Sequence, residues 1–264
     1  MSSPGGRHQR AWKVVLGTIL GMALVVGSAL YFYSTELPRP TGPFPVGRAC
    51  YAWTDRSRQE PWIDNPSERR QLLAYVWYPA PPVGPEAPYF PGLAQLSDQF
   101  RWYERFVLRS ARSRVRAAPA VAPGSEKYPV LLFSPGANNS SLFYNSLLAE
   151  LASHGFVVVG MEHTHEGRGQ VLPDGTVIAP DAERYRPRSD SPTRPAEEAS
   201  FYRKRVDVRS RDAVFVLDQL TWLDENDPLL VGVSTSRGWV FSVIPLAASQ
   251  PGRPPDWTPV SVRW

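Results

Sequence analysis

Between Tyr128 and Gly167 two short apolar runs flank a stretch in which apolar residues recur at helical spacing. The runs Tyr128–Phe133 and Phe156–Met161 contain no charged residue, which is typical of strands buried on both faces of a sheet. The stretch between them carries four leucines at helical spacing: Leu142, Leu147, Leu148 and Leu151. Two buried strands joined by a helix form a βαβ unit, so the sequence predicts a parallel sheet and an α/β fold.

Turn and cap residues mark the ends of these elements. Residues 134–136, Ser-Pro-Gly, end the first strand. The side-chain oxygens of Asn139, Ser140 and Ser141 can accept from the free N–H groups at a helix N-terminus. Gly155 stands just after the leucines, where helices commonly end in a left-handed residue.

Two further runs predict an antiparallel hairpin ahead of this unit. Val46–Trp53 and Gln71–Tyr78 both have the composition of strands, and the Asp55–Arg70 segment between them is polar and contains prolines. A second, shorter hairpin is predicted over Val171–Ile178, where Pro-Asp-Gly supplies the turn.

Between the first hairpin and the central unit, Leu93–Leu108 has apolar residues at helical spacing. Arg101, Arg105 and Arg109 lie on another face of this predicted helix. One interpretation is a solvated surface helix, and the other is a basic face near anionic lipid headgroups. The sequence pattern favours the first.

Phe201–Asn226 has the pattern of a long helix that ends before Asp227-Pro228. The pattern predicts an apolar buried stripe and solvated arginines. The predicted stripe is Val206, Ala213, Val216, Leu217, Leu220 and Leu223, and the arginines are Arg203, Arg205, Arg209 and Arg211. The preceding segment, Pro180–Glu198, is polar and proline-rich, so it is predicted to be a loop, which in an enzyme would be a lid or rim.

Near the N-terminus, Val14–Tyr33 is apolar except for one threonine and one serine. At ~1.5 Å per residue it is long enough to cross the ~30 Å hydrocarbon core of a bilayer. Arg7, Arg10 and Lys13 precede it, which predicts that the N-terminus stays in the cytoplasm and the rest of the chain lies outside. We expect an uncleaved signal anchor. The alternative is a signal peptide cut near residues 27–29, which would release a secreted protein.

Composition excludes few classes of protein. The chain has 264 residues, of which 42% are hydrophobic and 20% charged, as in ordinary globular proteins. A net charge of +4, with acids interspersed among the arginines, does not predict a nucleic-acid partner. The sequence contains no Walker loop, Gly-rich dinucleotide turn or zinc-ligand spacing, so it predicts no cofactor. Cys50 is the only cysteine, which excludes an intrachain disulfide.

Five segments carry a family resemblance, in the same order as in that family. They are PTGPFPVG at 40–47, RRQLLAYVWYPA at 69–80, YPVLLFSPG at 128–136, LASHGFVVVGMEH at 151–163 and DAVFVLDQL at 212–220. Together they resemble the platelet-activating-factor acetylhydrolases, which are α/β hydrolases related to bacterial lipases and esterases. The resemblance covers residues 40–230. It implies hydrolysis of carboxylic esters, typically a short acyl chain on a phospholipid, by Ser, Asp and His without a metal.

The resemblance also implies an oxyanion hole after the first central strand. Acyl transfer needs backbone N–H groups aimed at the developing negative charge, and by the resemblance Ala137 supplies one of them. Gly136 beside it would let the backbone approach the substrate closely. A tight turn at the end of a strand also requires glycine, so that interpretation stays open.

The remaining parts of a hydrolase site are missing from the sequence. A nucleophile elbow G-x-S-x-G is expected after residue 230, and the nearest match, residues 232–236, ends in serine instead of glycine. Ser234 is therefore a weak nucleophile candidate, and we assign no catalytic residue. The catalytic base should follow the nucleophile in the sequence, but all the histidines precede residue 230. They are His8, His154, His163 and His165.

His163 and His165 are expected to be structural or rim residues near the place where a site would open. Neighbouring Glu162 and Glu166 suggest a metal site at first sight, but no third cluster of ligands supports it. His163 also matches a position of the family that is not the catalytic base.

The segment after Leu230 departs from the α/β pattern, and we hypothesise that it is a frameshifted reading of the missing elbow. In the shifted frame, each triplet consists of the last base of one codon and the first two bases of the next. Read in this way, the codons of residues 238–248 can encode V-G-V-F-G-H-S-A-G-G. The codons just before this stretch permit R-L-D-L-A-R, residues 256–263 permit L-D-P-R-V-R-A, and the family carries similar strings. The shifted frame contains the nucleophile serine only if Ile244 is encoded by ATT. The excess of arginine over lysine suggests a GC-rich gene, in which ATT is an unusual codon.

The sequence thus predicts five segments: a cytoplasmic basic segment (1–13), a transmembrane signal anchor (14–33), a linker (34–45), a partial α/β-hydrolase domain (46–230) and an aberrant tail (231–264). We expect a membrane-anchored ester hydrolase whose C-terminal half is missing and which is inactive as written. The alternatives are a general cutinase-like esterase and a non-catalytic, membrane-anchored binding module. The expected partners are an ester or phospholipid substrate and the membrane, and no oligomeric state is predicted.

Overall fold

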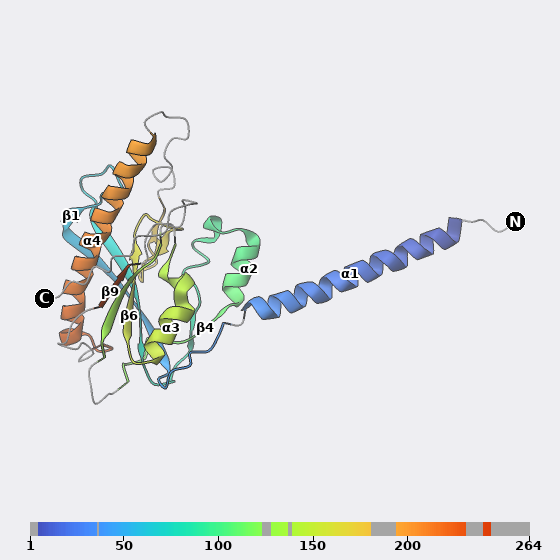
Figure 1. Ribbon diagram of the computed structural model, residues 1–264, viewed down its shortest axis with the longest axis horizontal. Coiled ribbons are helices and arrows are strands. Elements are labelled where there is room, and N and C mark those ends of the chain that lie inside the picture. The colour runs from blue at the N-terminus through green and yellow to red at the C-terminus, as the bar shows by residue number, and fades with distance from the viewer. Residues whose placement is uncertain are drawn as a thin grey trace.

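The computed structural model describes residues 5–35, 37–122, 128–136, 139–180, 194–230 and 240–243. Over these residues the chain forms a seven-stranded sheet in the order β3-β4-β1-β2-β6-β5-β9 (Figure 1). Its strands are β1 (Val46–Gln59), β2 (Arg69–Pro79), β3 (Glu86–Pro88), β4 (Arg112–Ala117), β5 (Val130–Ser134), β6 (Val157–His163) and β9 (Val240–Val243). A separate small sheet pairs β7 (Gln170–Val171) with β8 (Val177–Ile178) and confirms the predicted short hairpin.

Two helices cover opposite faces of the sheet. The helical elements are α1 (Gly5–Thr35), η1 (Ser97–Gln99), α2 (Trp102–Ser110), η2 (Ser141–Tyr144), α3 (Asn145–Ser153) and α4 (Arg194–Asn226). Even-numbered residues of β2, such as Leu72 and Val76, pack in one core cluster with α4, and odd-numbered ones, such as Leu73 and Trp77, pack in another with α3. Successive side chains of a strand point to opposite faces, so this division makes a helix–sheet–helix sandwich and confirms the α/β class.

Both predicted strand arrangements are confirmed. β1 and β2 pair antiparallel from Val46↔Pro79 onward, and β5 and β6 pair parallel across the α3 crossover. Ser140 is the N-cap of η2, where its side chain accepts from the N–H of Leu142. Gly155 ends the helical segment with a φ of +92°, which is a left-handed conformation that glycine adopts without strain.

The predicted helix over Leu93–Leu108 is correct only in its second half. The short 3₁₀ turn η1 and an extended Phe100 come first, and α2 begins after Arg101. Glu104 accepts from the backbone N–H of Arg101 at 2.8 Å, so a capping interaction starts a new helix there. The sequence pattern did not predict β4. Its three arginines alternate with the buried Ser113 and Val115, so the strand contains no run of apolar residues.

The prediction for α4 is right in the C-terminal half of the helix and wrong in the N-terminal half. Arg205 and Arg209, which we predicted to be solvated, are 3% and 7% exposed, whereas Val206, predicted to be buried, is 54% exposed. The buried stripe continues toward the N-terminus at helical spacing but carries charged residues there. Its members are Arg205, Val208, Arg209, Asp212, Ala213, Val216, Leu220 and Leu223. The reason is that this half of α4 faces buried carboxylates and backbone oxygens instead of apolar side chains.

The long helix α1 projects away from the domain (Figure 1). Within it, Ala11–Ala29 has a mean hydropathy of 1.7 and is 0% buried, and among the described residues it is the one helix long and apolar enough to cross a membrane. Length and composition alone make this span a candidate, and a signal sequence meets the same criteria.

Candidate active site

The predicted oxyanion turn follows β5 directly. Ser134 is the last residue of that strand, and the N–H of Asn139 donates to the carbonyl of Gly136 at 3.2 Å. A Cβ on Gly136 would lie 3.7 Å from the nearest heavy atom, an ordinary contact, so crowding does not demand glycine at this position. Ala137 lies outside the described residues. The turn is therefore at the expected carboxyl end of a central strand, and the role of its N–H groups stays a prediction.

Beneath this turn the structure brings together three residues that the sequence analysis did not connect. The Oγ of Ser134 lies 2.9 Å from Nε2 of His163, and Nδ1 of His163 lies 2.8 Å from Oδ2 of Asp212. Ser134 ends β5, His163 ends the neighbouring β6, and Asp212 reaches them from α4. Their exposures are 2%, 3% and 0%, so the whole chain of contacts is shielded from solvent.

The charges around these three residues determine the protonation of His163 and Asp212. Burial lowers the pKa of His163, and the positive charge of Arg209 lowers it further, so the imidazole is neutral. Burial tends to raise the pKa of Asp212, but the charge of Arg70 and the hydrogen bond from His163 outweigh it, so the pKa is lowered. A carboxylate only accepts, so Nδ1–H of His163 donates to Asp212 and Nε2 accepts from the hydroxyl of Ser134.

Asp212 is also the centre of a buried ionic cluster. Arg70, which is 0% exposed, donates to both of its oxygens, from Nε at 3.1 Å and from Nη2 at 2.6 Å. Nη1 of Arg70 in turn binds Glu60 at 3.1 Å and the hydroxyl of Thr164 at 2.8 Å. The paired fork of a guanidinium on a carboxylate is the geometry that makes a buried charge tolerable.

A second cluster ties α4 to the turn after β5. Nη2 of Arg209 lies 2.5 Å from Oε2 of Glu166, while Nη1 donates to the carbonyl of Pro135 at 2.6 Å and lies 3.4 Å from the Oγ of Ser134. Arg205 pairs with the same carboxylate at 3.3 Å. Arg209 thus holds the backbone of the turn directly, one residue before Gly136.

The hydrogen bonds from serine to histidine to carboxylate match those of a Ser-His-Asp triad. Two observations argue against a nucleophilic Ser134. Its side chain is buried at the base of the turn, and its oxygen already faces both His163 and the guanidinium of Arg209. We interpret the chain Ser134–His163–Asp212 as a structural network that fixes the position of the turn.

The other predicted polar residues go to separate partners. Glu162 accepts from the N–H of Ser141 at 2.7 Å and so caps η2, and burial raises its pKa to about 7. His165 faces the carbonyl of Ala179 at 3.2 Å, and His154, at the end of α3, faces Glu150 at 3.0 Å. Over the described residues no three His, Cys, Asp or Glu side chains are grouped as a metal site would require. Ser234 lies outside those residues, and so does the side chain of His8.

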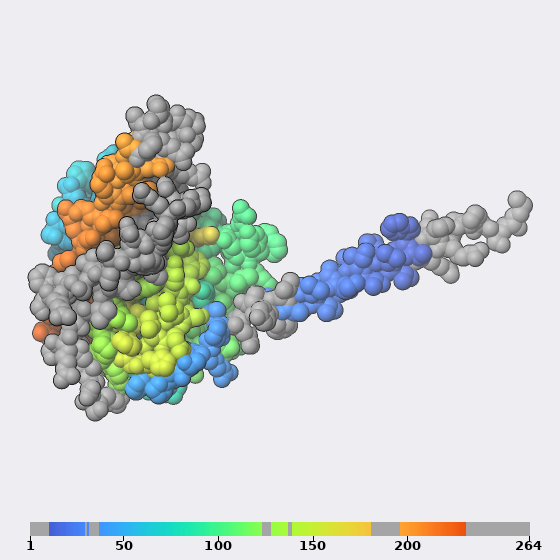
Figure 2. Space-filling view, viewed as in Figure 1, coloured from blue at the N-terminus to red at the C-terminus, as the bar shows by residue number. Residues whose placement is uncertain are grey.

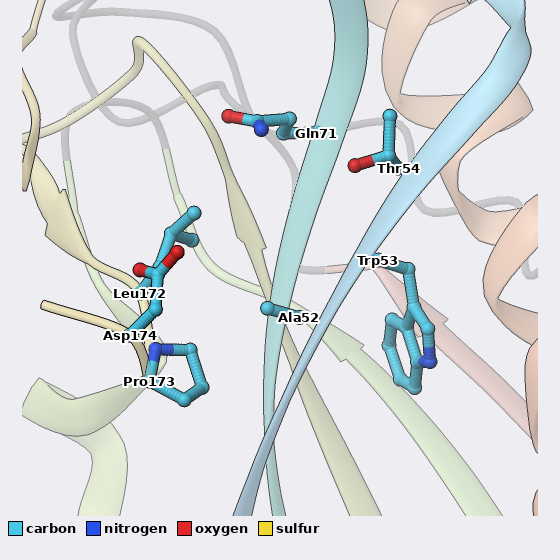
Figure 3. Close-up of a pocket in the computed structure, with 7 residues that line it drawn as sticks. All are labelled: Ala52, Trp53, Thr54, Gln71, Leu172, Pro173 and Asp174. Atoms are coloured by element: carbon cyan, nitrogen blue, oxygen red, sulfur yellow. The ribbon is translucent and has the colours of Figure 1, made fainter. Parts of the chain in front are cut away.

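An open groove of about 330 Å³ lies elsewhere on the surface (Figure 3). Ala52 and Thr54 lie on the side of β1 that faces Pro173 and Asp174 of the β7–β8 turn, and Gln71 lies at one end. The side chain of Trp53 points away from that turn. The carboxylate of Asp174 accepts from the N–H of Thr176 at 2.9 Å and so closes its own turn. None of the side chains that line the groove belongs to the buried network, so its position does not identify it as a reaction site.

Comparison with known proteins identifies the family. The family model described as platelet-activating factor acetylhydrolase, isoform II, matches residues 30–228, well over half of the chain. The chain belongs to this family. The match confirms the resemblance drawn from the five sequence segments, and it ends close to Leu230, where the α/β pattern of the sequence also ends.

Relatives agree with this assignment. A probable 1-alkyl-2-acetylglycerophosphocholine esterase of Arthroderma benhamiae is 30% identical over 78% of this chain and 54% of its own length. The platelet-activating factor acetylhydrolase of Cavia porcellus is 27% identical over 51% of this chain and 30% of its own. Among solved structures, a ferulic acid esterase from Streptomyces cinnamoneus matches with a TM-score of 0.60 and 26% identity, over 80% of this chain and 55% of its own. The chain thus spans about half the length of these relatives or less.

Proposed function

We propose that the complete family form of this protein hydrolyses carboxylic esters, with a short acyl chain on a lipid as the expected substrate. The observation that supports this most directly is the register of the last described strand. β9 pairs parallel with β5, and Val243 stands opposite Ser134. β5 and β9 therefore end side by side at the same edge of the sheet. In α/β hydrolases the nucleophile elbow and the oxyanion-hole loop occupy these two neighbouring positions.

The proposed mechanism assigns the turn after β5 to charge stabilisation. The N–H of Ala137 would donate to the oxyanion, with Gly136 leaving room for the substrate, and a serine after β9 would attack the ester carbonyl. Arg209 keeps the turn in place through the carbonyl of Pro135. In the written sequence, however, no G-x-S-x-G follows residue 230 and no histidine follows His165. We therefore propose that this chain is inactive.

This proposal predicts that the purified 264-residue chain hydrolyses p-nitrophenyl acetate no faster than its Ser234→Ala and Ser134→Ala variants. A spectrophotometric assay at neutral pH measures this, with circular dichroism to confirm that each variant is folded. Turnover that Ser234→Ala abolishes would make Ser234 the nucleophile. Turnover that Ser134→Ala abolishes in a folded protein would make the buried network catalytic. Either result would overturn the proposed inactivity.

The family alternative is a general cutinase-like or lipase-like esterase, and the ferulic acid esterase neighbour is the finding that favours it. Acyl-chain selectivity on lipid and on soluble esters would separate the two in an active form. A non-catalytic, membrane-anchored binding module is the other alternative. Stable expression of the 264-residue chain and a cooperative thermal transition would favour the module, whereas rapid degradation would favour a broken enzyme.

We further propose that α1 anchors the domain to a membrane, with residues 34–264 on the extracytoplasmic side. The apolar span Ala11–Ala29 and the basic residues before it support this orientation. Protease added to intact cells is expected to digest the domain and leave an N-terminal tag protected until the cells are lysed. Full protection of the domain in intact cells would overturn the orientation.

A further inference from the structure

Glu162, near the end of β6, is a buried carboxyl group whose hydrogen bonds, among the described residues, all go to the segment after the predicted oxyanion turn. Its exposure is 2%. Three donors meet at one of its oxygens, Oε1: the hydroxyl of Ser140 at 2.9 Å, the N–H of Ser141 at 2.7 Å and the hydroxyl of Ser141. Burying a carboxyl group is costly unless it is hydrogen-bonded, so these three bonds account for its place in the fold.

We propose that Glu162 is a positioning residue that fixes the far end of the turn after β5, the turn whose N–H groups would stabilise the oxyanion. This inference rests on the proposed function of that turn and adds a residue to it. Arg209 holds the near end, where Nη1 donates to the carbonyl of Pro135 at 2.6 Å. Glu162 holds the far end at Ser140 and Ser141. Two elements, α4 and β6, therefore restrain the turn from both ends, and oxyanion donors act best when they are held in place beforehand.

The packing of Ser141 adds a second restraint at the same end. Ser141 is 0% exposed and lies over Gly160 of β6, where an added Cβ would come within 2.6 Å of the Cβ of Ser141. Gly160 and Glu162 are two residues apart on the strand, so their side-chain positions lie on the same face of the sheet. The glycine leaves room for Ser141 and the carboxyl group binds it, so both residues of β6 fit the start of η2.

The surroundings of Glu162 also identify the conservative variant. Glu162 lines a small cavity of about 10 Å³ together with Ser140 and Gln170. The side-chain N–H groups of Gln170 donate to the carbonyls of His163 at 3.3 Å and Glu166 at 3.0 Å, while its Oε1 is buried without a donor among the described residues. A glutamine at residue 162 keeps Oε1 as an acceptor for the serines and brings an amide N–H to the cavity that holds this orphaned acceptor. Glu162→Gln therefore removes the charge and keeps the contacts that carry the proposal.

Hydrogen–deuterium exchange of the full chain in detergent micelles, followed by mass spectrometry, tests the proposal without enzymatic activity. Glu162→Ala is compared with Glu162→Gln, and Glu150→Ala is the matched control. Glu150 also accepts from a backbone N–H and a hydroxyl, both of Thr41, but its side chain is 36% exposed. It belongs to α3, which forms part of the outer surface beside the linker (Figure 2). The control thus loses a similar set of hydrogen bonds at the surface, away from the turn.

We expect Glu162→Ala to speed the exchange of the N–H groups of residues 141–144 roughly 5- to 100-fold, the range for leaving a buried donor without its acceptor, and to leave the β1–β2 hairpin unchanged. In Glu162→Gln and Glu150→Ala the same residues should exchange at the rate of the wild type. Unchanged exchange in Glu162→Ala would overturn the proposal. A Glu162→Gln protein that exchanges as fast as Glu162→Ala would also overturn it, because the glutamine retains the acceptor oxygen.

A second variant covers the case in which Glu162→Ala loses protection over the whole sheet. Ser140→Ala removes one of the three donors and leaves both donors of Ser141. Faster exchange confined to residues 141–144 in this variant would support the proposal, and any other result would overturn it. None of these outcomes depends on turnover, so a failure here is separate from a failure of the proposed ester hydrolysis, which the p-nitrophenyl ester assays detect.

Discussion

Replacing Asp212 with alanine is expected to lower the free energy of unfolding by about 3–5 kcal/mol, the range for removing one partner of a buried ion pair. Asp212 is 0% exposed and accepts from Arg70, from His163 and, at 3.0 Å, from Arg58. The alanine variant leaves the guanidinium of Arg70 buried with fewer partners and leaves Nδ1–H of His163 without an acceptor. Asp212 then no longer offsets the desolvation penalty of either group.

Urea unfolding of the full chain in detergent micelles, followed by tryptophan fluorescence, measures this difference. Asp207→Ala is the matched control, because Asp207 lies on the same helix and pairs with Arg211 at the surface, where the side chains are 57% and 63% exposed. That variant should change stability by less than about 1 kcal/mol. Equal stabilities of the Asp212→Ala and Asp207→Ala proteins would show that the buried cluster does not hold α4 on the sheet.

The fold was largely predictable because its central strands are buried on both faces and its hairpins have clear turn residues. The runs at Tyr128–Phe133 and Phe156–Met161 became β5 and β6, and Gln71–Tyr78 became the core of β2. The strand β4 was not predictable, since a strand with arginine at alternate positions has no continuous apolar signal. In each case, a strand could be predicted only where its buried positions carry apolar residues.

The site was much less predictable for the same reason. On α4 the positions of Arg205, Arg209 and Asp212 continue the apolar stripe at helical spacing, but charged residues in a sequence indicate a solvated face by default. Their partners are distant in sequence: Arg70 lies on β2 and His163 on β6. Only the register of the sheet and the position of α4 bring them together. The stripe of Val216, Leu220 and Leu223 was the one available clue that Asp212 faces inward.

Restoring the reading frame between codons 228 and 232 is expected to produce an active esterase. The restored chain should contain G-H-S-A-G-G and then an Asp and a His, in the order of an α/β hydrolase. The shifted reading permits V-G-V-F over residues 238–242, which overlap β9, so a strand at the same place would lead into the elbow. Val243 of β9 stands opposite Ser134, so we expect the new serine to lie next to the turn at Gly136.

Hydrolysis of short-chain p-nitrophenyl esters by the restored and the 264-residue proteins measures this effect. Changing the serine encoded across the Ile244 and Pro245 codons to alanine should lower kcat by on the order of 10⁶, the scale for losing the nucleophile of a triad. Ser134→Ala in the restored protein should leave far more activity, because Ser134 positions the turn and does not attack the ester. The DNA sequence gives the decisive check. If ATC encodes Ile244, the shifted triplet is proline, no nucleophile stands after β9, and the frameshift hypothesis fails.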